Sequence, residues 1–300
     1  MMPDLPLDQV RTLLAVVDEG TFDAAAAALH VTPSAISQRV KALEQRTGRV
    51  LLMRTKPVRL TESGQVVVRF ARQLARLERD AGAELGLSGS GEPVRLPIAV
   101  NADSLSTWFL SALARVPDEL RISFELHRED QDHTTTLLKE GAVLAAVTSS
   151  PDPVTGCSVR RLGHVRYLPV ASPGFAARYL PGWPSTPLRR LLAEAPVVIF
   201  DRRDDLQDRF TRALTRGTAS ARRHYVPASE PFVEAIAMGM GWGMVPRAQA
   251  DPLLRKGSLV ELAPERPITI PLFWQQWKLD SPALAAVAEA VAAEAREALD

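Results

Sequence analysis

The sequence predicts three parts: an N-terminal all-α winged helix-turn-helix domain, a long linker helix, and a larger α/β domain. An alanine-rich segment precedes a Thr-Pro pair at Thr32 and Pro33, which is typical of two short helices joined by a tight turn. A polar-rich stretch with apolar residues at helical spacing follows Leu60. After Pro93, short apolar runs alternate with segments of helical periodicity, which indicates alternating strands and helices.

Three helices are expected in the first part. The first carries apolar residues at steps of three and four and can end at Gly20. Its inward residues are Val10, Leu13, Leu14 and Val17. The second, Ala24 to Ala28, is nearly all alanine, so a neighbouring helix can approach closely. Thr32 is expected to cap the third helix, and Pro33 suits its first position.

The third helix separates an apolar face from a polar one. Ile36, Val40 and Leu43 fall at helical spacing and are expected to pack inward. The opposite face offers hydrogen-bonding side chains with little apolar bulk: Ser34, Ser37, Gln38, Lys41 and Gln45. Such a face suits the groove of double-stranded DNA, whereas an ordinary helical hairpin is the alternative interpretation.

A basic run follows, and it favours DNA binding. Seven basic residues stand against one acid, Glu44, so this stretch has a local net charge of +6 in a chain of net charge +1. The basic residues are Arg39, Lys41, Arg46, Arg49, Arg54, Lys56 and Arg59. The pattern of Leu51 to Leu60 also predicts two short strands around a turn, which would place the last three of these basic residues on a wing. A solvated charged face remains the alternative.

A long helix should begin after Thr61, which can cap it. Its apolar residues alternate steps of three and four, a spacing typical of a two-stranded coiled coil. The predicted seam consists of Val67, Phe70, Leu74, Leu77 and Ala81. The same spacing also suits a single helix packed on its own domain, and the pattern alone leaves both possibilities open.

The third part begins after a boundary rich in Gly, Ser and Pro between Leu87 and Pro93. The predicted strands are Leu96 to Val100, Ile122 to Leu126, Leu144 to Thr148, Val165 to Val170, Val197 to Phe200, Gly243 to Val245 and Ile270 to Trp274. The predicted helices are Leu105 to Ala114, Thr134 to Glu140, Leu206 to Leu214, Phe232 to Met240 and Ser281 to Leu299. This alternation predicts mostly parallel sheets.

The N-terminal part resembles the winged helix-turn-helix of the LysR-type transcriptional regulators. The resemblance is carried by FDAAAAALHVTPSAISQRVKALEQRTGRVLLMRT and the LTESG that follows. It implies that the helix from Pro33 lies in the major groove, so that Thr32, Ser34, Ser37, Gln38 and Arg39 contact bases or backbone. It places Arg54 and its wing neighbours on flanking phosphates. It also implies that residues 61–87 form a dimerisation helix and that the protein is a dimer or a dimer of dimers.

Further segments resemble the branch of this family that responds to lysine and arginine and controls amino-acid export. They are VNADSLSTWFL, HREDQDHT, VVIFDRRDDLQ and ASEPFVEA, in that order. The resemblance implies a DNA-binding domain over residues 1–60, a hinge over 88–92 and a periplasmic-binding-protein-like effector domain over 93–300. Lobe I would comprise 93–162 and 267–300, and lobe II 163–266. An amino acid would then bind between the lobes and RNA polymerase would be a partner.

Acidic and hydroxyl side chains at predicted strand ends suit such a ligand. Asp103 can pair with an amino group, while Ser104 and Ser106 can hold a carboxylate at a helix start. Acids at the other strand ends can face a distal cationic group. They are Glu129, Asp130, Asp132, Asp201, Asp204 and Glu230. The alternative is that these acids are helix caps or solvated charges.

Composition excludes several other classes. The chain has one cysteine, Cys157, so it can hold neither a disulfide nor a cysteine zinc site. No apolar run reaches the roughly 20 residues of a membrane span, and the start lacks a basic signal-peptide region, which predicts a cytoplasmic protein without membrane contact. No catalytic or metal-binding constellation is recognised, so we expect neither an enzyme nor a cofactor. A LysR-type regulator with a different effector and a solute-binding protein remain alternatives.

Overall fold

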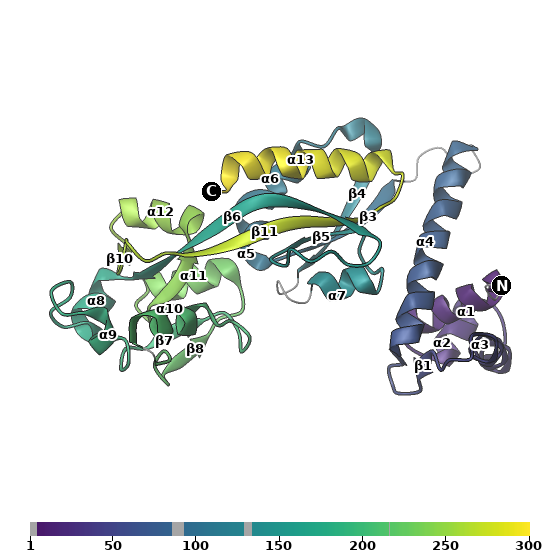
Figure 1. The fold of residues 1–300 in the computed structure, drawn as a ribbon, viewed down its shortest axis with the longest axis horizontal. Coiled ribbons are helices and arrows are strands. Elements are labelled where there is room, and N and C mark those ends of the chain that lie inside the picture. The colour runs from purple at the N-terminus through teal and green to yellow at the C-terminus, as the bar shows by residue number, and fades with distance from the viewer. Residues whose placement is uncertain (1–4, 86–92, 129–133, 216) are drawn as a thin grey trace.

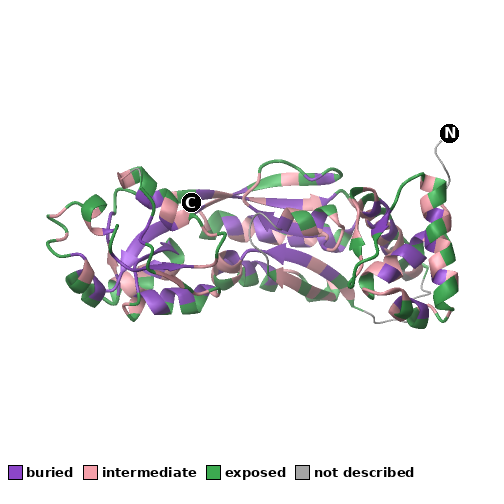
Figure 2. Cartoon of the chain, turned by 90° about the horizontal axis from the view of Figure 1, so that it is seen from below, coloured by how far each residue is buried: buried purple, intermediate pink, exposed green. Residues whose placement is uncertain are grey.

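The computed structural model describes residues 5–85, 93–128, 134–215 and 217–300. Figure 1 shows a small helical domain at the N-terminal end, a long helix α4, and an elongated domain made of two lobes. Buried residues line the strands of the large sheet and the inner faces of the helices that cover it (Figure 2). The three predicted parts are therefore present in the predicted order.

The N-terminal domain packs three helices around one core. They are α1 (Leu7–Asp18), α2 (Phe22–Ala28) and α3 (Pro33–Thr47). Thr32 caps α3, because its hydroxyl accepts a hydrogen bond from the Ala35 amide at 3.2 Å. Gly48 ends α3 in the left-handed conformation, at φ 65°. Ile36, Val40 and Leu43 are buried, which confirms the predicted inward face.

The wing consists of β1 (Leu52–Met53) and β2 (Arg59–Leu60), paired antiparallel. Helix α4 (Glu62–Glu84) follows at once, and Thr61 caps it by accepting a hydrogen bond from the Gly64 amide at 3.0 Å. A Cβ atom on Gly64 would lie 2.0 Å from the carbonyl oxygen of Leu51. Only glycine therefore allows the first turn of α4 to lie against the wing.

One residue of the predicted seam on α4 lies elsewhere. Val67 is buried in the core of the N-terminal domain together with Val68 and Ala71. The exposed apolar face carries Val66 and other residues one helical turn apart. The predicted seam therefore needs one correction, since Val67 packs in the core of its own chain. Of the other seam residues, Phe70, Leu77 and Ala81 are exposed and Leu74 is partly buried.

The C-terminal domain is built on a mixed sheet in the order β10-β6-β11-β5-β3-β4, and β9 pairs with β6. Strands β3, β4 and β5 run parallel, whereas β6, β9, β10 and β11 pair antiparallel. The sheet is thus less parallel than predicted. The strands of lobe I and the two long shared strands are β3 (Val94–Val100), β4 (Ile122–Arg128), β5 (Ala145–Thr148), β6 (Cys157–Ala171) and β11 (Ile268–Trp277).

Helices cover the sheet of lobe I. They are α5 (Ala102–Ser104), the π-helix η1 (Leu105–Phe109), α6 (Leu110–Ala114), the short 3-10 helix η2 (Asp118–Leu120), α7 (Thr134–Lys139) and α13 (Pro282–Ala298). Helices α6 and α13 pack on each other over one face (Figure 1). Ser281 caps α13, since its hydroxyl accepts a hydrogen bond from the Leu284 amide.

Lobe II contains several elements that periodicity did not predict. Its elements are α8 (Pro173–Tyr179), α9 (Leu188–Leu191), β7 (Val197–Ile199), α10 (Leu206–Thr215), β8 (Arg223–Tyr225), α11 (Ser229–Ala237), β9 (Gly243–Pro246), α12 (Arg247–Arg255) and β10 (Val260–Glu261). The predictions missed β8, β10, α8, α9 and α12. Each is short or polar, so its apolar pattern is weak.

Two long strands, β6 and β11, pass through both lobes. Their antiparallel register shifts between Leu272 and Phe273, opposite Gly163, whose φ is 152°. The predicted lobe boundary at residues 162–163 falls at this register shift. Residues 268–272, which follow the predicted return near residue 267, pair with residues 163–167. The predicted hinge at 88–92 lies outside the described residues.

We expect Gly64→Ala to destabilise the N-terminal domain by about 3 kcal/mol, because the new methyl group overlaps the Leu51 carbonyl. All five tryptophans lie in the C-terminal domain, so far-UV circular dichroism should report the loss in urea while tryptophan fluorescence does not. Gly174→Ala is the control, since a Cβ there meets no atom within 4 Å. Equal unfolding midpoints for all three proteins would contradict this packing constraint.

Candidate functional site

The outer face of α3 is accessible along its length. Ser34, Gln38 and Lys41 are exposed, and Ser37 and Arg39 are partly exposed. Thr32 is exposed as well, but its hydroxyl already caps the helix and is less available to another partner. The face therefore presents donors and acceptors without apolar bulk, as the sequence predicts.

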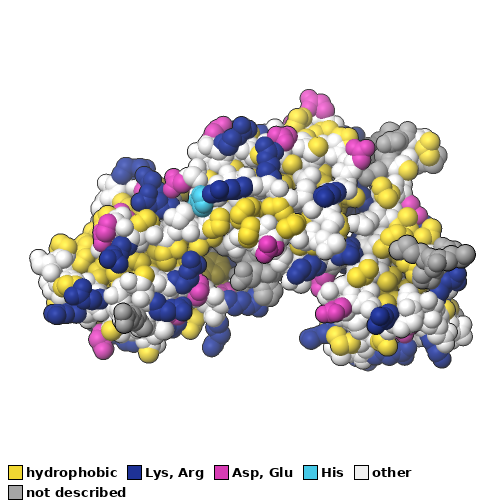
Figure 3. All heavy atoms as spheres, viewed as in Figure 1, with side chains coloured by type: hydrophobic (Ala, Val, Ile, Leu, Met, Phe, Trp, Pro, Cys, Tyr) yellow, Lys and Arg dark blue, Asp and Glu magenta, His cyan; other side chains and the backbone are white. Residues whose placement is uncertain are grey.

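The wing carries positive charge beside this face. Arg54, Lys56 and Arg59 are exposed, and the Arg54 guanidinium lies 5.5 Å from the Phe22 ring centroid. The carboxylate of Glu44, the only acid in the basic run, is engaged by the backbone of the wing, because it accepts hydrogen bonds from the Leu51 and Leu52 amides at 2.8 and 3.4 Å. Figure 3 shows Lys and Arg side chains along the lower edge of the N-terminal domain. The arrangement suits contact with phosphates.

A cavity of about 520 Å³ lies between the two lobes of the C-terminal domain. Both lobes and the shared strand β11 contribute to its wall. Its polar and charged lining residues are Asn101, Asp103, Ser149, Tyr167, Asp201, Arg203, Asp204, Asp205, Arg209 and Thr269. Four aspartates against two arginines give the lining an excess of negative charge, and the volume suits one small molecule.

Asp103 joins the lobes at this cavity. It follows β3 in lobe I, and its two carboxylate oxygens accept hydrogen bonds from the Tyr167 hydroxyl at 2.7 Å and the Ser229 hydroxyl at 2.8 Å. Tyr167 lies on the lobe II part of β6, and Ser229 begins α11. Burial raises the pKa of the Asp103 carboxyl, and the two hydrogen bonds oppose that rise. A cation at this position would favour the ionised form.

Asp204 is the second acid with a raised pKa. Burial is the main cause, and the nearby Asp103 carboxylate adds to it, whereas hydrogen bonds from the Phe200 and Leu206 amides lower it. Asp201 holds the same loop, because its carboxylate accepts from the Arg203 and Asp204 amides. Two carboxylates that disfavour each other's charge therefore face one cavity.

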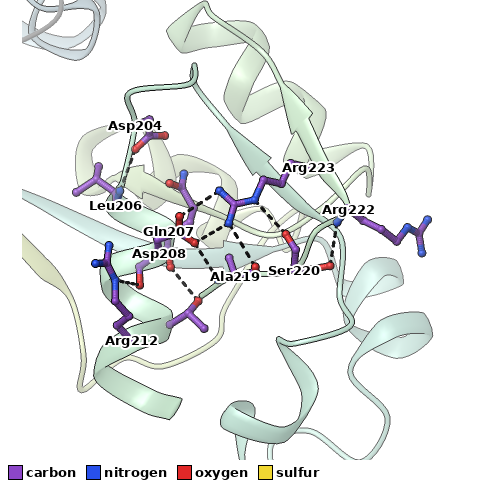
Figure 4. A network of polar contacts seen from close by, with 10 residues as sticks. Asp204, Leu206, Gln207, Asp208, Arg212, Ala219, Ser220, Arg222 and Arg223 are labelled. Atoms are coloured by element: carbon purple, nitrogen blue, oxygen red, sulfur yellow. Dashed lines mark hydrogen bonds and ion pairs between the residues drawn. The ribbon is translucent and has the colours of Figure 1, made fainter. Parts of the chain in front are cut away.

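A separate ion pair holds this loop region together. Burial raises the pKa of Asp208, but the Arg223 guanidinium and the Ala219 amide outweigh it, so the pKa lies below its ordinary value. Asp208 binds Arg223 through both oxygens, at 2.8 and 3.1 Å (Figure 4). The bidentate pair ties α10, which begins just after Asp204, to β8.

Several polar residues of the cavity wall were not predicted from sequence, and Asn101 and Tyr167 are two of them. Asn101 is only 4% exposed and its Oδ1 atom has no hydrogen-bond partner among the described residues. Tyr167 lies in a strand with an apolar pattern, so the sequence does not mark its hydroxyl as part of a cavity. Asn101 directly follows β3, so its position at a strand end was the available signal.

Not all predicted ligand residues reach the cavity. Ser104 is fully buried and lies outside the lining, and its hydroxyl has no partner among the described residues. Ser106 is exposed on the π-helix and does not line the cavity. Glu230 is exposed at the start of α11 and does not line the cavity. Glu129, Asp130 and Asp132 lie outside the described residues.

Three further observations concern metal binding, membrane crossing and cysteine chemistry among the described residues. No group of three or more histidine, cysteine, aspartate or glutamate side chains there could hold a metal ion. None of the described helices is long and apolar enough to cross a membrane. Cys157 is buried, and burial raises its thiol pKa to about 11, so it is a poor nucleophile.

Two protein-family models match the chain. The model for bacterial regulatory helix-turn-helix proteins of the lysR family matches residues 7–65. The model for the LysR substrate binding domain matches residues 90–296. The two matches follow the division seen in the fold.

Two curated relatives cover nearly the whole chain. The HTH-type transcriptional regulator LysG of Mycobacterium tuberculosis is 45% identical over 294 residues, which cover 98% of this chain and 94% of the relative. The lysine export transcriptional regulatory protein LysG of Corynebacterium glutamicum is 43% identical over 296 residues, which cover 97% and 98%.

Solved structures of similar proteins share the fold. ArgP from Mycobacterium tuberculosis superposes with a TM-score of 0.86 at 43% identity, covering 97% of both chains. Full-length LysG from Corynebacterium glutamicum with bound effector Arg gives 0.82 at 42% identity, covering 98% and 99%. Another structure of full-length LysG from the same organism gives 0.63 at 41% identity, covering 99% of both.

We expect the two faces of the N-terminal domain to respond differently to substitution. Ser37→Ala or Gln38→Ala should weaken binding to the preferred DNA sequence by about 1–3 kcal/mol and change binding to unrelated DNA little, because base contacts specify. Arg54→Ala should weaken both and reduce the slope of log K against log salt by about one. Fluorescence anisotropy with two duplexes measures both, and Lys256→Ala in lobe II is the control. Equal losses on all DNA would contradict the proposed recognition face.

Proposed function

Because the chain belongs to the LysR family of bacterial regulatory helix-turn-helix proteins, we propose that it is a transcriptional regulator that senses lysine or arginine and controls genes for amino-acid export. A relative named as a lysine export transcriptional regulatory protein covers almost all of it at 43% identity. The observation that carries the effector class is the acidic cavity between the lobes, with Asp103 and Asp204 both facing inward.

The cavity favours a ligand with two positive groups and one negative group. In the proposed arrangement, Asp103 and Asp204 bind the cationic groups of the amino acid, and the buried Asn101 oxygen accepts one further hydrogen bond. The arginines in the lining, Arg203 and Arg209, supply positive charge for the α-carboxylate. This replaces Ser104 and Ser106 in that role, since neither lines the cavity.

Effector binding is proposed to act on lobe closure. Asp103 in lobe I already bonds to Tyr167 and Ser229 in lobe II, and the Arg128 guanidinium of β4 donates to the Pro227 carbonyl at 3.3 Å. A cation at Asp103 competes with or adds to these contacts, so it changes the relative stability of the lobe arrangements. Only such differential affinity can shift the equilibrium and alter the spacing of the DNA-binding domains.

Several further partners belong to this proposal. The exposed apolar face of α4, with Val66, Phe70 and Leu77, is proposed to pair with a second copy, and tetramers would be dimers of such dimers. Two paired domains present recognition helices to successive turns of double-stranded DNA. RNA polymerase is the proposed partner in activation. A regulator of this kind acts where the DNA is, in the bacterial cytoplasm.

We expect saturating lysine or arginine to raise the melting temperature of the full-length protein. At a ligand concentration of about 100 times Kd, linkage adds about 2.7 kcal/mol to the stability of the C-terminal domain. Norleucine and citrulline keep the α-amino and α-carboxyl groups but lack the distal charge, so their shifts should be much smaller. Tryptophan fluorescence reports this domain.

Two variants sharpen this test. Asp103→Asn should lower affinity at least about tenfold, because it removes a carboxylate from the cation site while keeping its shape. Glu230→Gln is the matched control, since Glu230 is an exposed acid outside the lining. A shift in melting temperature of the same size with norleucine, or an unchanged affinity in Asp103→Asn, would contradict the proposed effector class.

Effector affinity should fall with acidification. The Asp103 pKa is raised in the ligand-free protein, and a bound cation favours its carboxylate and lowers that pKa. Binding therefore releases protons, and affinity decreases as the pH falls through the raised pKa. Isothermal titration in two buffers of different ionisation enthalpy, from about pH 8 to about pH 5, measures both effects. A constant affinity with no proton release would contradict the role of Asp103.

A further inference from the structure

Three arginines of α4 face lobe I of the same chain. Arg69, Arg72 and Arg76 stand three and four residues apart, so they form one stripe along the helix. Each reaches a different segment of lobe I. The stripe therefore spans more than one turn of the contact between the linker helix and the sensor domain.

Arg76 and Arg69 anchor the two ends of this contact. Arg76 is only 6% exposed, and its guanidinium donates to the Arg95 carbonyl at 3.2 Å and to the Ser281 hydroxyl at 3.3 Å. Arg69 lies 5.6 Å from the ring centroid of Trp277, the last residue of β11. A buried guanidinium and a stacked one require a defined helix position, since both lose their partners if α4 slides or turns.

Arg72 joins the DNA-binding domain to the sensor domain through one side chain. Its Nη2 atom binds the Asp18 carboxylate at the end of α1, at 2.9 Å. Its Nη1 atom donates to the Glu140 carbonyl, just after α7 in lobe I, at 2.7 Å. The side chain is 24% exposed, so its contacts are partly shielded from solvent.

The elements that meet this stripe also reach the cavity. Strand β3 carries Arg95 near its start, and Asn101 and Asp103, both in the cavity wall, follow its end. Strand β11 carries Thr269 in the wall and ends at Trp277 under Arg69. A change in lobe arrangement at the cavity therefore displaces strands whose far ends contact α4.

Structures of a close relative differ in overall arrangement. The two full-length structures of LysG from Corynebacterium glutamicum superpose on this chain with TM-scores of 0.82 and 0.63, although their identities to it are 42% and 41%. The same family sequence thus occurs in more than one arrangement.

We propose that the Arg69, Arg72 and Arg76 stripe is the contact that couples the effector cavity to the DNA-binding domain, with Arg72 as its positioning residue. The coupling rests on the proposed function, since it transmits the effect of lysine or arginine to DNA. In the docked arrangement the recognition helix and lobe I form one body. Loss of Arg72 removes the link between Asp18 and the Glu140 carbonyl and so loosens the DNA-binding domain against lobe I, while every group proposed to touch DNA or effector stays in place.

The test compares Arg72→Ala with Arg79→Ala, an exposed arginine of α4 for which the structure gives no interdomain contact. Affinity for DNA selected by the wild-type protein from genomic fragments is measured with and without saturating arginine. The wild type and Arg79→Ala should show an effector-dependent ratio of about fivefold or more. Arg72→Ala should bring this ratio close to one, while its separate affinities for arginine and DNA stay within about threefold of wild type. A wild-type ratio in Arg72→Ala overturns the proposal.

Hydrogen exchange of the effector-free full-length protein separates this proposal from the proposed function. Arg72→Ala should speed amide exchange after α7, at residues 140–142, and in the middle of α4, because the docked contact opens. If the wild type shows no effector-dependent ratio with either amino acid, the proposed function fails, while faster exchange in Arg72→Ala still supports the Arg72 contact between the two domains. Unchanged exchange in Arg72→Ala overturns the Arg72 contact in either case.

Discussion

The antiparallel pairing of β6 with β11 is the constraint on which the sensor domain depends. These two strands run through both lobes, and the shift of register opposite Gly163 lets the strands bend where the lobes meet. Because the backbone bonds of the pair are kept on either side of the shift, the lobes can change their angle without losing the sheet. A cavity beside this point is the place where a small ligand has most effect on that angle.

The electrostatics of the cavity follow from this geometry. Asp103 reaches from lobe I to hydroxyls of lobe II, and Asp204 stands near enough to raise its own pKa through the Asp103 charge. Burying two carboxylates costs free energy unless a cation balances them. Hydroxyls and amides satisfy part of the hydrogen-bonding capacity of the two carboxylates, and a dibasic amino acid would balance their charge. The acidic lining is therefore a means of selecting ligands by charge.

The sequence predicted the elements with strong local signals. Thr32, Pro33 and Gly48 mark the ends of α3 through capping chemistry, which depends only on neighbouring residues. The strands of lobe I were found because their apolar runs are continuous. Asn101 and Tyr167 were missed, since a role in a cavity depends on what the other lobe brings close. Ser106 follows the same strand as Asp103 but does not line the cavity, and no periodic pattern in the sequence reports this difference.

Helix α4 ties these parts together by dividing its surface into three faces. At 100° per residue, Val67, Val68 and Ala71 point to the DNA-binding core, the arginine stripe points to lobe I, and Val66, Phe70 and Leu77 point outward, about a third of a turn apart. A rigid helix cannot rotate to improve one contact without disturbing the other two. If α4 follows a shift of lobe I, it changes either its packing against the DNA-binding core or the direction of its outward apolar face. Both determine how two copies of the protein meet DNA.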